Sequence, residues 1–192
     1  MMYNKKRKIE VENNYMNKIK NSKDILYRVE KNFPIPGVNF IDLTPTLTEP
    51  GYFKIIAEQL KTKILDTTKD FDYIISPDAR GFIWGAYLAA LLEKPFIPIR
   101  KHGKLPASSI MSTIEDKTEY SNIQLDIPIA NLENKKCIFI DDVYATGGTY
   151  KACKQLVETN NGILNDAYVI LDILLTDDKV NALITANDLE ID

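Results

Sequence analysis

The sequence is poor in the residues that build disulfide scaffolds and metal clusters. Its 192 residues include two cysteines and one histidine. Two cysteines cannot make a disulfide-rich secreted scaffold or a four-cysteine zinc site. A His-dependent triad or a His-ligated metal centre would have to use His102, and a two-histidine motif is impossible. Metal clusters and disulfide frameworks are therefore excluded.

Long apolar runs are also missing. The longest, Gly81 to Leu92, is too short to span a bilayer. Residues 1–21 carry charges but lack the apolar segment of a secretory signal. We therefore expect a cytoplasmic protein that has no membrane partner and keeps its cysteines reduced. The basic cluster Lys5 to Lys8 is typical of a solvated arm, with localisation or phosphate binding as the lesser alternative.

Neither sign of charge is in large excess. The chain has 24 Lys and Arg against 27 Asp and Glu, a net charge of −3, and 45% of its residues are hydrophobic. This composition is typical of a globular protein rather than a disordered one. The length predicts a single domain, residues 1–192, with a sizeable core. The slight acidity gives no support for a nucleic-acid partner held by bulk charge.

Apolar patterning predicts helices that alternate with strands. The predicted helices cover residues 19–30, 52–65, 82–92 and 150–158, and the predicted strands cover residues 71–76, 95–100, 120–127, 135–140 and 167–175. Such alternation indicates an α/β fold with a parallel, twisted sheet flanked by helices. Residues 1–20 are polar and are predicted to form an N-terminal arm.

Two segments are predicted to be irregular. Residues 32–46 contain three prolines and Gly37, which disfavour regular structure, yet they are rich in apolar side chains. They suit either a hood over a ligand or a loop packed on the core. Residues 101–119 are polar and show no clear period, and loops of this length are often functional lids. We expect a mobile loop there.

The most informative motif is IFIDDVYATGGT, residues 138–149. A buried strand leads to two adjacent carboxylates, Asp141 and Asp142, at the sheet edge where α/β proteins bind ligands. The loop that follows can surround a phosphate with backbone N–H groups, hydroxyls and a helix N-terminus; it comprises Ala145, Thr146, Gly147, Gly148 and Thr149. The acids would repel a phosphate, so we expect them to face sugar hydroxyls or a shared cation. The alternative, a glycine-rich turn with solvated acids, does not explain the acid pair.

This motif resembles the phosphoribosyl pyrophosphate signature of the type I phosphoribosyltransferases. Three further segments resemble those of the adenine phosphoribosyltransferases, in the same order. They are the base-covering loop at residues 32–45, the pyrophosphate loop at residues 78–85, and the catalytic loop at residues 100–106 with Glu119 and Tyr120. The resemblance extends over about residues 33–175, and the four segments together are more specific than any one of them.

The resemblance implies a reaction. Adenine would attack C1 of 5-phosphoribosyl 1-pyrophosphate, giving AMP and pyrophosphate in purine salvage. It also implies a homodimer and a Mg²⁺ ion held mainly by the substrate, with Asp141 or Asp142 as the acids that could reach it. A hood over the base site, formed by residues 32–46, is implied as well.

Roles for single residues follow from the same resemblance. The pyrophosphate would be bound by Asp78, Ala79, Arg80, Arg100, Lys101 and Lys104. Arg80 would also be catalytic, since its planar guanidinium group can donate two parallel hydrogen bonds to phosphate oxygens. Glu119 would manage a proton on the purine, and Tyr120 would shield or position the reacting groups. The base would lie against Val38, Asn39 and Phe40, while His102 receives no role.

Two alternatives stay open. Ile41 stands where the family usually has arginine, so the base could be a 6-oxopurine such as hypoxanthine, guanine or xanthine. The chain could also be a non-catalytic regulator that binds the sugar pyrophosphate and contacts nucleic acid. The retained Arg80 and Glu119 favour catalysis over this second alternative.

Overall fold

A computed structural model of the chain describes residues 25–118 and 121–189, with side chains described outside residues 116–123. The predicted arm at residues 1–20 and the predicted catalytic pair Glu119 and Tyr120 lie outside the described residues. Two compact units are present, one containing the described residues 25–59 and 187–189, the other Leu60–Ala186. The single domain expected from the length stays a prediction.

The smaller unit is built on a hairpin. Strand β1 (Arg28–Lys31) pairs antiparallel with β2 (Asn39–Asp42), so that Val29 lies opposite Ile41. The helix predicted for residues 19–30 is therefore wrong over its described part, residues 25–30, of which residues 28–30 belong to β1. The apolar spacing there fits a helical turn, but pairing with a distant segment decides the conformation. Helix α3 (Tyr52–Thr67) begins in this unit and confirms the helix predicted over residues 52–65.

Regular structure also extends into the segment predicted to be an irregular hood. Only residues 32–38 connect the two strands, while residues 39–42 form β2 and α2 (Thr44–Thr48) follows. Pro45 occupies the first turn of α2, where its missing N–H group costs no helical hydrogen bond. Prolines therefore did not exclude regular structure from residues 39–46.

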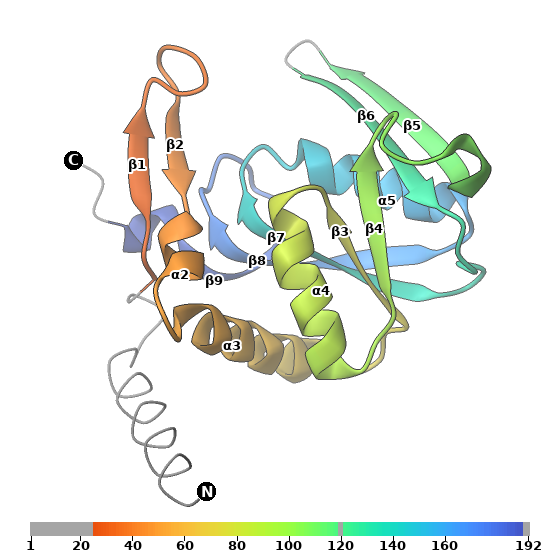
Figure 1. Cartoon of the computed structure of the whole chain (residues 1–192), viewed down its shortest axis with the longest axis horizontal. Coiled ribbons are helices and arrows are strands. Elements are labelled where there is room, and N and C mark those ends of the chain that lie inside the picture. Colours follow the sequence, from red (N-terminus) through yellow and green to blue (C-terminus); the bar gives the residue numbers. More distant parts are fainter. Residues whose placement is uncertain (1–24, 119–120, 190–192) are drawn as a thin grey trace, which may run out of the picture. The chain divides into compact units, whose positions relative to one another are not determined.

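The larger unit contains a seven-stranded sheet in the order β5-β6-β4-β3-β7-β8-β9 (Figure 1). Its strands are β3 (Tyr73–Pro77), β4 (Phe96–Lys101), β5 (Ile110–Thr118), β6 (Ser121–Pro128), β7 (Lys136–Tyr144), β8 (Ile163–Asp172) and β9 (Asn181–Thr185). The pairs β4–β3, β3–β7, β7–β8 and β8–β9 are parallel, whereas β6 is antiparallel to β4 and β5. The α/β prediction is confirmed, with an antiparallel hairpin added to the parallel core.

That hairpin corrects the predicted loop at residues 101–119. Of its described residues, only 102–109 lie outside strands, including the short 3-10 helix Ala107–Ser109, and residues 110–118 form β5. β5 is an edge strand with largely polar side chains, and Ile114 is buried at 8% exposure. One buried side chain among polar neighbours leaves little periodic signal. Strand β9, at the opposite edge, was not predicted; a short 3-10 helix, Ala186–Asp188, follows it.

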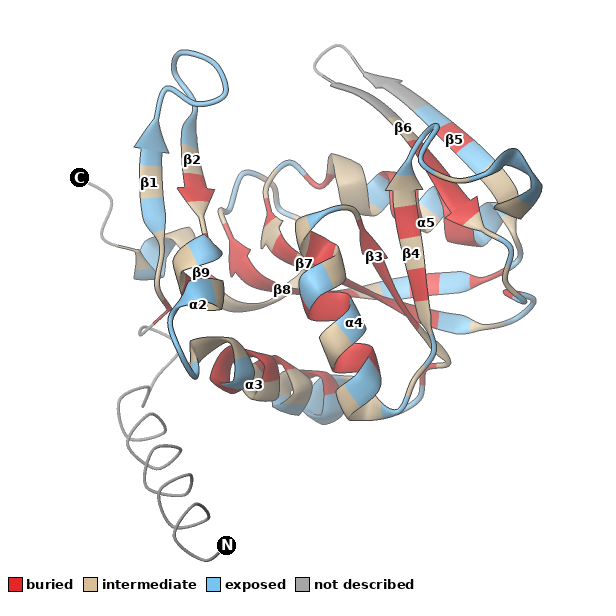
Figure 2. Cartoon of the chain, in the orientation of Figure 1, coloured by how far each residue is buried: buried red, intermediate tan, exposed pale blue. Residues whose placement is uncertain are grey.

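Two helices cover the faces of this sheet. Helix α4 (Arg80–Leu92) packs on β3 and β7 from one side, and α5 (Gly148–Thr159) packs on β8 and β6 from the other (Figure 1). Trp84 of α4 and Cys153 of α5 are fully buried, and Figure 2 shows the buried strands between the helices. Cys137 and Cys153 are both free, as expected, and both are buried. Within residues 25–118 and 121–189, none of the helices could span a lipid bilayer.

Gly85 sets how closely α4 approaches the sheet. A Cβ on Gly85 would overlap the Ser76 hydroxyl of β3 and would lie 2.9 Å from Cε2 of Phe96 in β4. Only glycine permits this approach without displacing the helix. The close packing matters because α4 begins at Arg80, at the sheet edge where β3, β4 and β7 end.

Candidate active site

Three connections leave the larger unit's sheet at the carboxyl ends of neighbouring parallel strands. One joins β3 to α4 through Asp78 and Ala79, one follows β4, and one joins β7 to α5. Open α/β sheets bind ligands at this edge. The residues predicted to bind phosphate and pyrophosphate therefore all lie at one end of one sheet.

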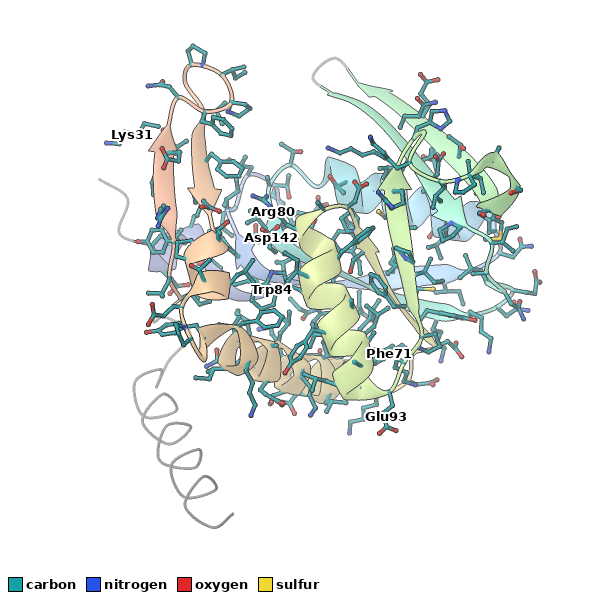
Figure 3. The ribbon with its side chains drawn as sticks, viewed as in Figure 1. Lys31, Phe71, Arg80, Trp84, Glu93 and Asp142 are labelled. Carbon is teal, nitrogen blue, oxygen red and sulfur yellow. The ribbon has the colours of Figure 1, made fainter. Side chains whose placement is uncertain are left out.

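Arg80 and Asp142 form an ion pair there. The Arg80 Nε lies 2.9 Å from the Asp142 Oδ2, and the Asp142 side chain is 4% exposed against 41% for Arg80 (Figure 3). Arg80 was expected to bind pyrophosphate and Asp142 to face sugar hydroxyls. In the structure the two are paired, so Asp142 orients the guanidinium while Arg80 keeps a solvent-facing surface.

Asp141 and Asp142 lie inside β7, which runs to Tyr144 instead of ending before the acids. The backbone N–H of Asp142 donates to Asp141 Oδ1 at 2.9 Å. Burial, followed by the charge of Asp142, raises the pKa of Asp141 well above its ordinary value. Burial also raises the pKa of Asp142, although Arg80 opposes the shift. The pair is therefore suited to partners that supply protons or positive charge.

Asp78 fixes the start of the segment after β4. The Arg100 Nε and the Lys101 backbone N–H each lie 3.2 Å from Asp78 Oδ2. The Arg100 guanidinium carbon also lies 5.7 Å from the centre of the Phe82 ring. Asp78 Oδ1 is buried and has no hydrogen-bond partner within the described part of the chain. This oxygen is available to a bound group.

Arg100 to Lys104 form what we term the cationic turn. The backbone N–H of Lys104 donates to the carbonyl of Lys101 at 3.2 Å, which closes the turn. Lys101 and Lys104 are exposed and Arg100 is half-buried. The three cationic residues predicted to bind pyrophosphate therefore all lie on one short segment beside Asp78.

Thr146 to Thr149, here called the phosphate loop, open α5. Gly147 is the N-cap of α5 with a φ of +76°, and a Cβ there would overlap the Tyr144 hydroxyl. Tyr144 donates to Asp178 Oδ2 at 2.9 Å, and Lys151 Nζ lies 3.1 Å from the same oxygen. The first N–H groups of a helix lack internal partners and favour anions. Tyr144, Lys151 and Asp178 support this loop and were missed, because they meet only in the folded chain.

A hollow of about 480 Å³ joins these parts. It is lined by Pro77, Asp78, Lys101, His102, Gln124, Leu125 and Thr149. The hollow thus brings together the turn before α4, the cationic turn and the end of the phosphate loop. Its mixed lining of an acid, a lysine, a histidine and a hydroxyl suits a charged, hydrated ligand.

The predicted base-contacting residues lie in the smaller unit. Asn39 and Phe40 open β2, and Val38 precedes them. The rings of Phe33 and Phe40 pack edge to face with centroids 5.4 Å apart, and Gly37 N–H donates to Asn32 Oδ1 at 2.9 Å. Their contact with a base stays a prediction.

His102, which the sequence left without a role, has a strong partner. Its Nδ1 lies 2.9 Å from Oδ1 of Asp126, a fully buried residue of β6. The two are 24 residues apart in the chain. No local motif could reveal this pair, since it depends on β6 lying beside β4.

Comparison with known proteins gives consistent matches. A family model described as phosphoribosyl transferase domain matches residues 46–165. The adenine phosphoribosyltransferase of Kosmotoga olearia is 40% identical over 154 residues, covering 80% of this chain and 88% of that protein. The crystal structure of adenine phosphoribosyltransferase from Thermoanaerobacter pseudethanolicus matches with a TM-score of 0.78 at 33% identity, covering 86% of this chain and 99% of that one. The Saccharomyces cerevisiae adenine phosphoribosyltransferase, crystallised with adenine and an imino-altritol bisphosphate, has a TM-score of 0.74 at 27% identity, covering 88% and 98% of the two chains.

Proposed function

We propose that this chain, which belongs to the phosphoribosyltransferase family, is an enzyme of purine salvage that converts adenine and 5-phosphoribosyl 1-pyrophosphate into AMP and pyrophosphate. The observation that carries this proposal is the hollow on which Asp78, Lys101 and Thr149 converge. It offers an anion two kinds of contact, the cationic side chain of Lys101 and a helix N-terminus at Thr149, as a substrate with a phosphate and a pyrophosphate requires.

Each part of the substrate has a matching part of the site. The 5-phosphate suits the phosphate loop, where Gly147 lets the backbone turn and the α5 N–H groups face outward. The ribose hydroxyls suit Asp141 and Asp142, because hydroxyl groups can donate hydrogen bonds to the half-buried carboxylate of Asp141 and the buried carboxylate of Asp142. The pyrophosphate suits Arg80 and the cationic turn, whose positive groups offset its charge.

The same residues explain how transfer is favoured. As the bond from C1 to the pyrophosphate breaks, negative charge grows on the leaving group. Arg80, already oriented by Asp142, would stabilise that charge without reorganising. Lys101 and Lys104 would add to this effect and help to exclude water, which competes with adenine for C1.

A Mg²⁺ ion fits the donor set, and we propose it as the cofactor. Oxygen ligands are what Mg²⁺ prefers, and Asp78 Oδ1 is a buried oxygen without a described partner. Asp141 and Asp142 are the other candidate ligands. No group of three or more His, Cys, Asp or Glu side chains within residues 25–118 and 121–189 could hold a metal alone. When bound, the ion would neutralise charge on the pyrophosphate, with substrate oxygens completing its shell.

Adenine is the proposed base. The yeast relative was crystallised with adenine, and Ile41, the position that left a 6-oxopurine open, is buried at 8% exposure in β2. Its side chain is therefore not part of an exposed surface that could contact a base directly. We propose that Val38, Asn39 and Phe40 contact the base, and that Glu119 and Tyr120 act in catalysis as the resemblance implies.

The direct test is product formation. Purified protein with Mg²⁺, adenine and 5-phosphoribosyl 1-pyrophosphate should form AMP and pyrophosphate in equal amounts, measured by chromatography and a pyrophosphate assay. Chelation of Mg²⁺ should abolish turnover. Binding of the sugar pyrophosphate without turnover on any base would instead support the non-catalytic regulator.

We also propose a homodimer, with α4 as its contact surface. The inner face of α4 is buried through Trp84 and Leu88, yet Ile83, Ala86 and Ala90 on the outer face are exposed. Between Arg80 and Glu93 the helix carries no charged side chain. A helix that is apolar all round is normally buried on both sides, and a two-fold axis lets one such face cover itself.

Sedimentation analysis tests this surface. The dimer dissociation constant of the Ile83→Glu variant should be at least about tenfold higher than that of the wild type, because dimerisation would bury a carboxylate. Leu65→Glu, at an exposed apolar position of α3, is the matched control and should keep the wild-type mass. A monomeric wild type would refute the dimer.

We propose the cytoplasm as the compartment. Both cysteines are free, and burial, with a smaller effect from Asp72, raises the pKa of Cys137 to about 12. Such a thiol is unreactive and suits a protein that forms no disulfides.

A further inference from the structure

His102 is the chain's one histidine, and it lies in the cationic turn. It lines the hollow together with Asp78, Lys101 and Thr149. Its side chain is 47% exposed, and its Nδ1 is held 2.9 Å from Asp126 Oδ1. No described residue bonds Nε2, so one ring nitrogen is fixed and the other is available to a ligand.

Asp126 is built to stay ionised. It is fully buried, and its carboxylate accepts hydrogen bonds from Thr113 Oγ1 at 2.6 Å and from the Gly103 N–H at 3.1 Å. Burial alone would raise the pKa of Asp126, but the hydrogen bonds from Thr113, His102 and Gly103 together hold it below its ordinary value. A fixed carboxylate keeps the proton on Nδ1 of His102.

This arrangement gives Nε2 two states. In the neutral ring Nε2 carries a lone pair, which repels a phosphate oxygen. In the protonated ring Nε2 becomes a donor on a cation, which attracts one. The ring therefore suits an anion only after it takes up a proton.

Charged groups of both signs lie near the ring. Asp126 of β6 and Asp78 of the turn before α4 are acids. Lys101 and Lys104 of its own turn and Arg100 at the end of β4 are cations. A polyanion that enters the hollow would add negative charge beside the ring and neutralise the opposing cations.

We propose that His102 is a further ligand of the pyrophosphate group, and that the entry of a polyanion into the hollow is coupled to the uptake of one proton from solvent by its imidazole. Asp126 holds the ring and supplies the counter-charge. This inference rests on the proposed function, in which the hollow receives the pyrophosphate.

Proton NMR tests the coupling directly, because the chain's one histidine gives one set of imidazole signals. The titration midpoint of the ring is measured with and without saturating inorganic pyrophosphate, in the presence of Mg²⁺. The midpoint should rise by at least about half a pH unit when the anion binds. A midpoint that pyrophosphate leaves unchanged would overturn the proposal.

Affinity measurements on His102→Asn supply an independent test. The asparagine amide can still donate to Asp126, so the turn keeps its anchor, but the titrating group and Nε2 are lost. Wild type should bind pyrophosphate roughly tenfold more tightly than this variant at pH 6 and nearly equally at pH 8. Titration of pyrophosphate itself affects both proteins alike. An equal ratio at both pH values would indicate a structural role only and would contradict the proposal.

Two further observations keep the outcomes distinct. If His102→Asn fails to fold by circular dichroism, His102→Gln replaces it, and the wild-type NMR titration needs no variant. AMP formation is measured on the same wild-type sample. Turnover with a fixed midpoint refutes the inference alone, whereas a shifted midpoint without turnover on any base refutes the proposed function but leaves the anion site standing.

Discussion

Among single residues, Asp141 shows how a side chain suited to ligand binding can lower the stability of the free protein. It shares a buried strand with Asp142, and Gly81 lets the first turn of α4 come close, so that a Cβ on Gly81 would lie 3.0 Å from Asp141 Oδ1. Burial and the neighbouring charge raise the pKa of Asp141. The free protein therefore holds an acid whose ionised form is unfavourable until a ligand offers hydroxyl groups or a cation.

The Asp141→Asn variant should separate these two effects. An acid whose pKa is raised in the folded state stabilises the fold when protonated and loses that contribution as the pH rises above its ordinary range. The wild type should therefore lose stability relative to the variant between pH 5 and pH 8, by about 1 kcal/mol. Affinity for 5-phosphoribosyl 1-pyrophosphate should fall by about 1–3 kcal/mol, since a charged acceptor is lost.

Urea unfolding at both pH values and calorimetric titration of the substrate check this prediction. Asp70→Asn, at an exposed aspartate paired with Lys136, is the matched control for removing one charge. A stability difference that does not change with pH, or unchanged substrate affinity, would count against the assigned role of Asp141.

The strands show at the scale of elements what the sequence could and could not predict. β3, β4 and β7 are apolar runs that each precede a turn, and all three were predicted. β1 and β5 were missed, because each is defined by its partner strand. Around β1 the spacing of Ile25, Leu26 and Val29 imitates a helix, and the sequence of β5 has too few apolar residues to show a period.

In the candidate site, too, some features could be predicted from the sequence and others depend on the fold. Asp78, Arg80 and the phosphate loop belong to contiguous motifs, so their meeting at one sheet edge could be predicted. The pairing of Arg80 with Asp142, the support of Gly147 by Tyr144, and the link from His102 to Asp126 depend on tertiary contacts. Sequence motifs therefore indicated the candidate site, while packing determined how its charged groups are paired.

The contact between α4 and β3 gives a prediction at this scale. A Cβ in Gly85→Ala would overlap Ser76, so the helix must move and the protein should lose about 1–3 kcal/mol of stability. Because Arg80 begins the same helix, substrate affinity should fall as well. Urea midpoints and substrate titration measure both effects.

Ser76 provides the control for that prediction. Its buried hydroxyl has no partner within the described residues, so Ser76→Ala alone should cost little. The double variant Ser76→Ala, Gly85→Ala should recover part of the lost stability. If the two substitutions are simply additive, the steric explanation is wrong.

The distribution of charge over the whole molecule matters more than its total. A net charge of −3 would not suggest a polyanionic substrate. Cations are nevertheless concentrated in the larger unit at Arg80 and the cationic turn, and the acids beside them are either paired or raised in pKa. The predicted base contacts lie in the smaller unit, so recognition of the base and of the sugar phosphate are assigned to different parts of the chain.

Competition between bases tests directly whether the chain transfers the phosphoribosyl group to adenine. Equal amounts of adenine, hypoxanthine, guanine and xanthine are supplied with limiting 5-phosphoribosyl 1-pyrophosphate and Mg²⁺, and the nucleotides are identified by mass spectrometry. Product ratios then report relative kcat/KM values within one reaction. AMP should make up nearly all of the nucleotide formed. A predominance of IMP, GMP or XMP would contradict the account, and so would the absence of any nucleotide.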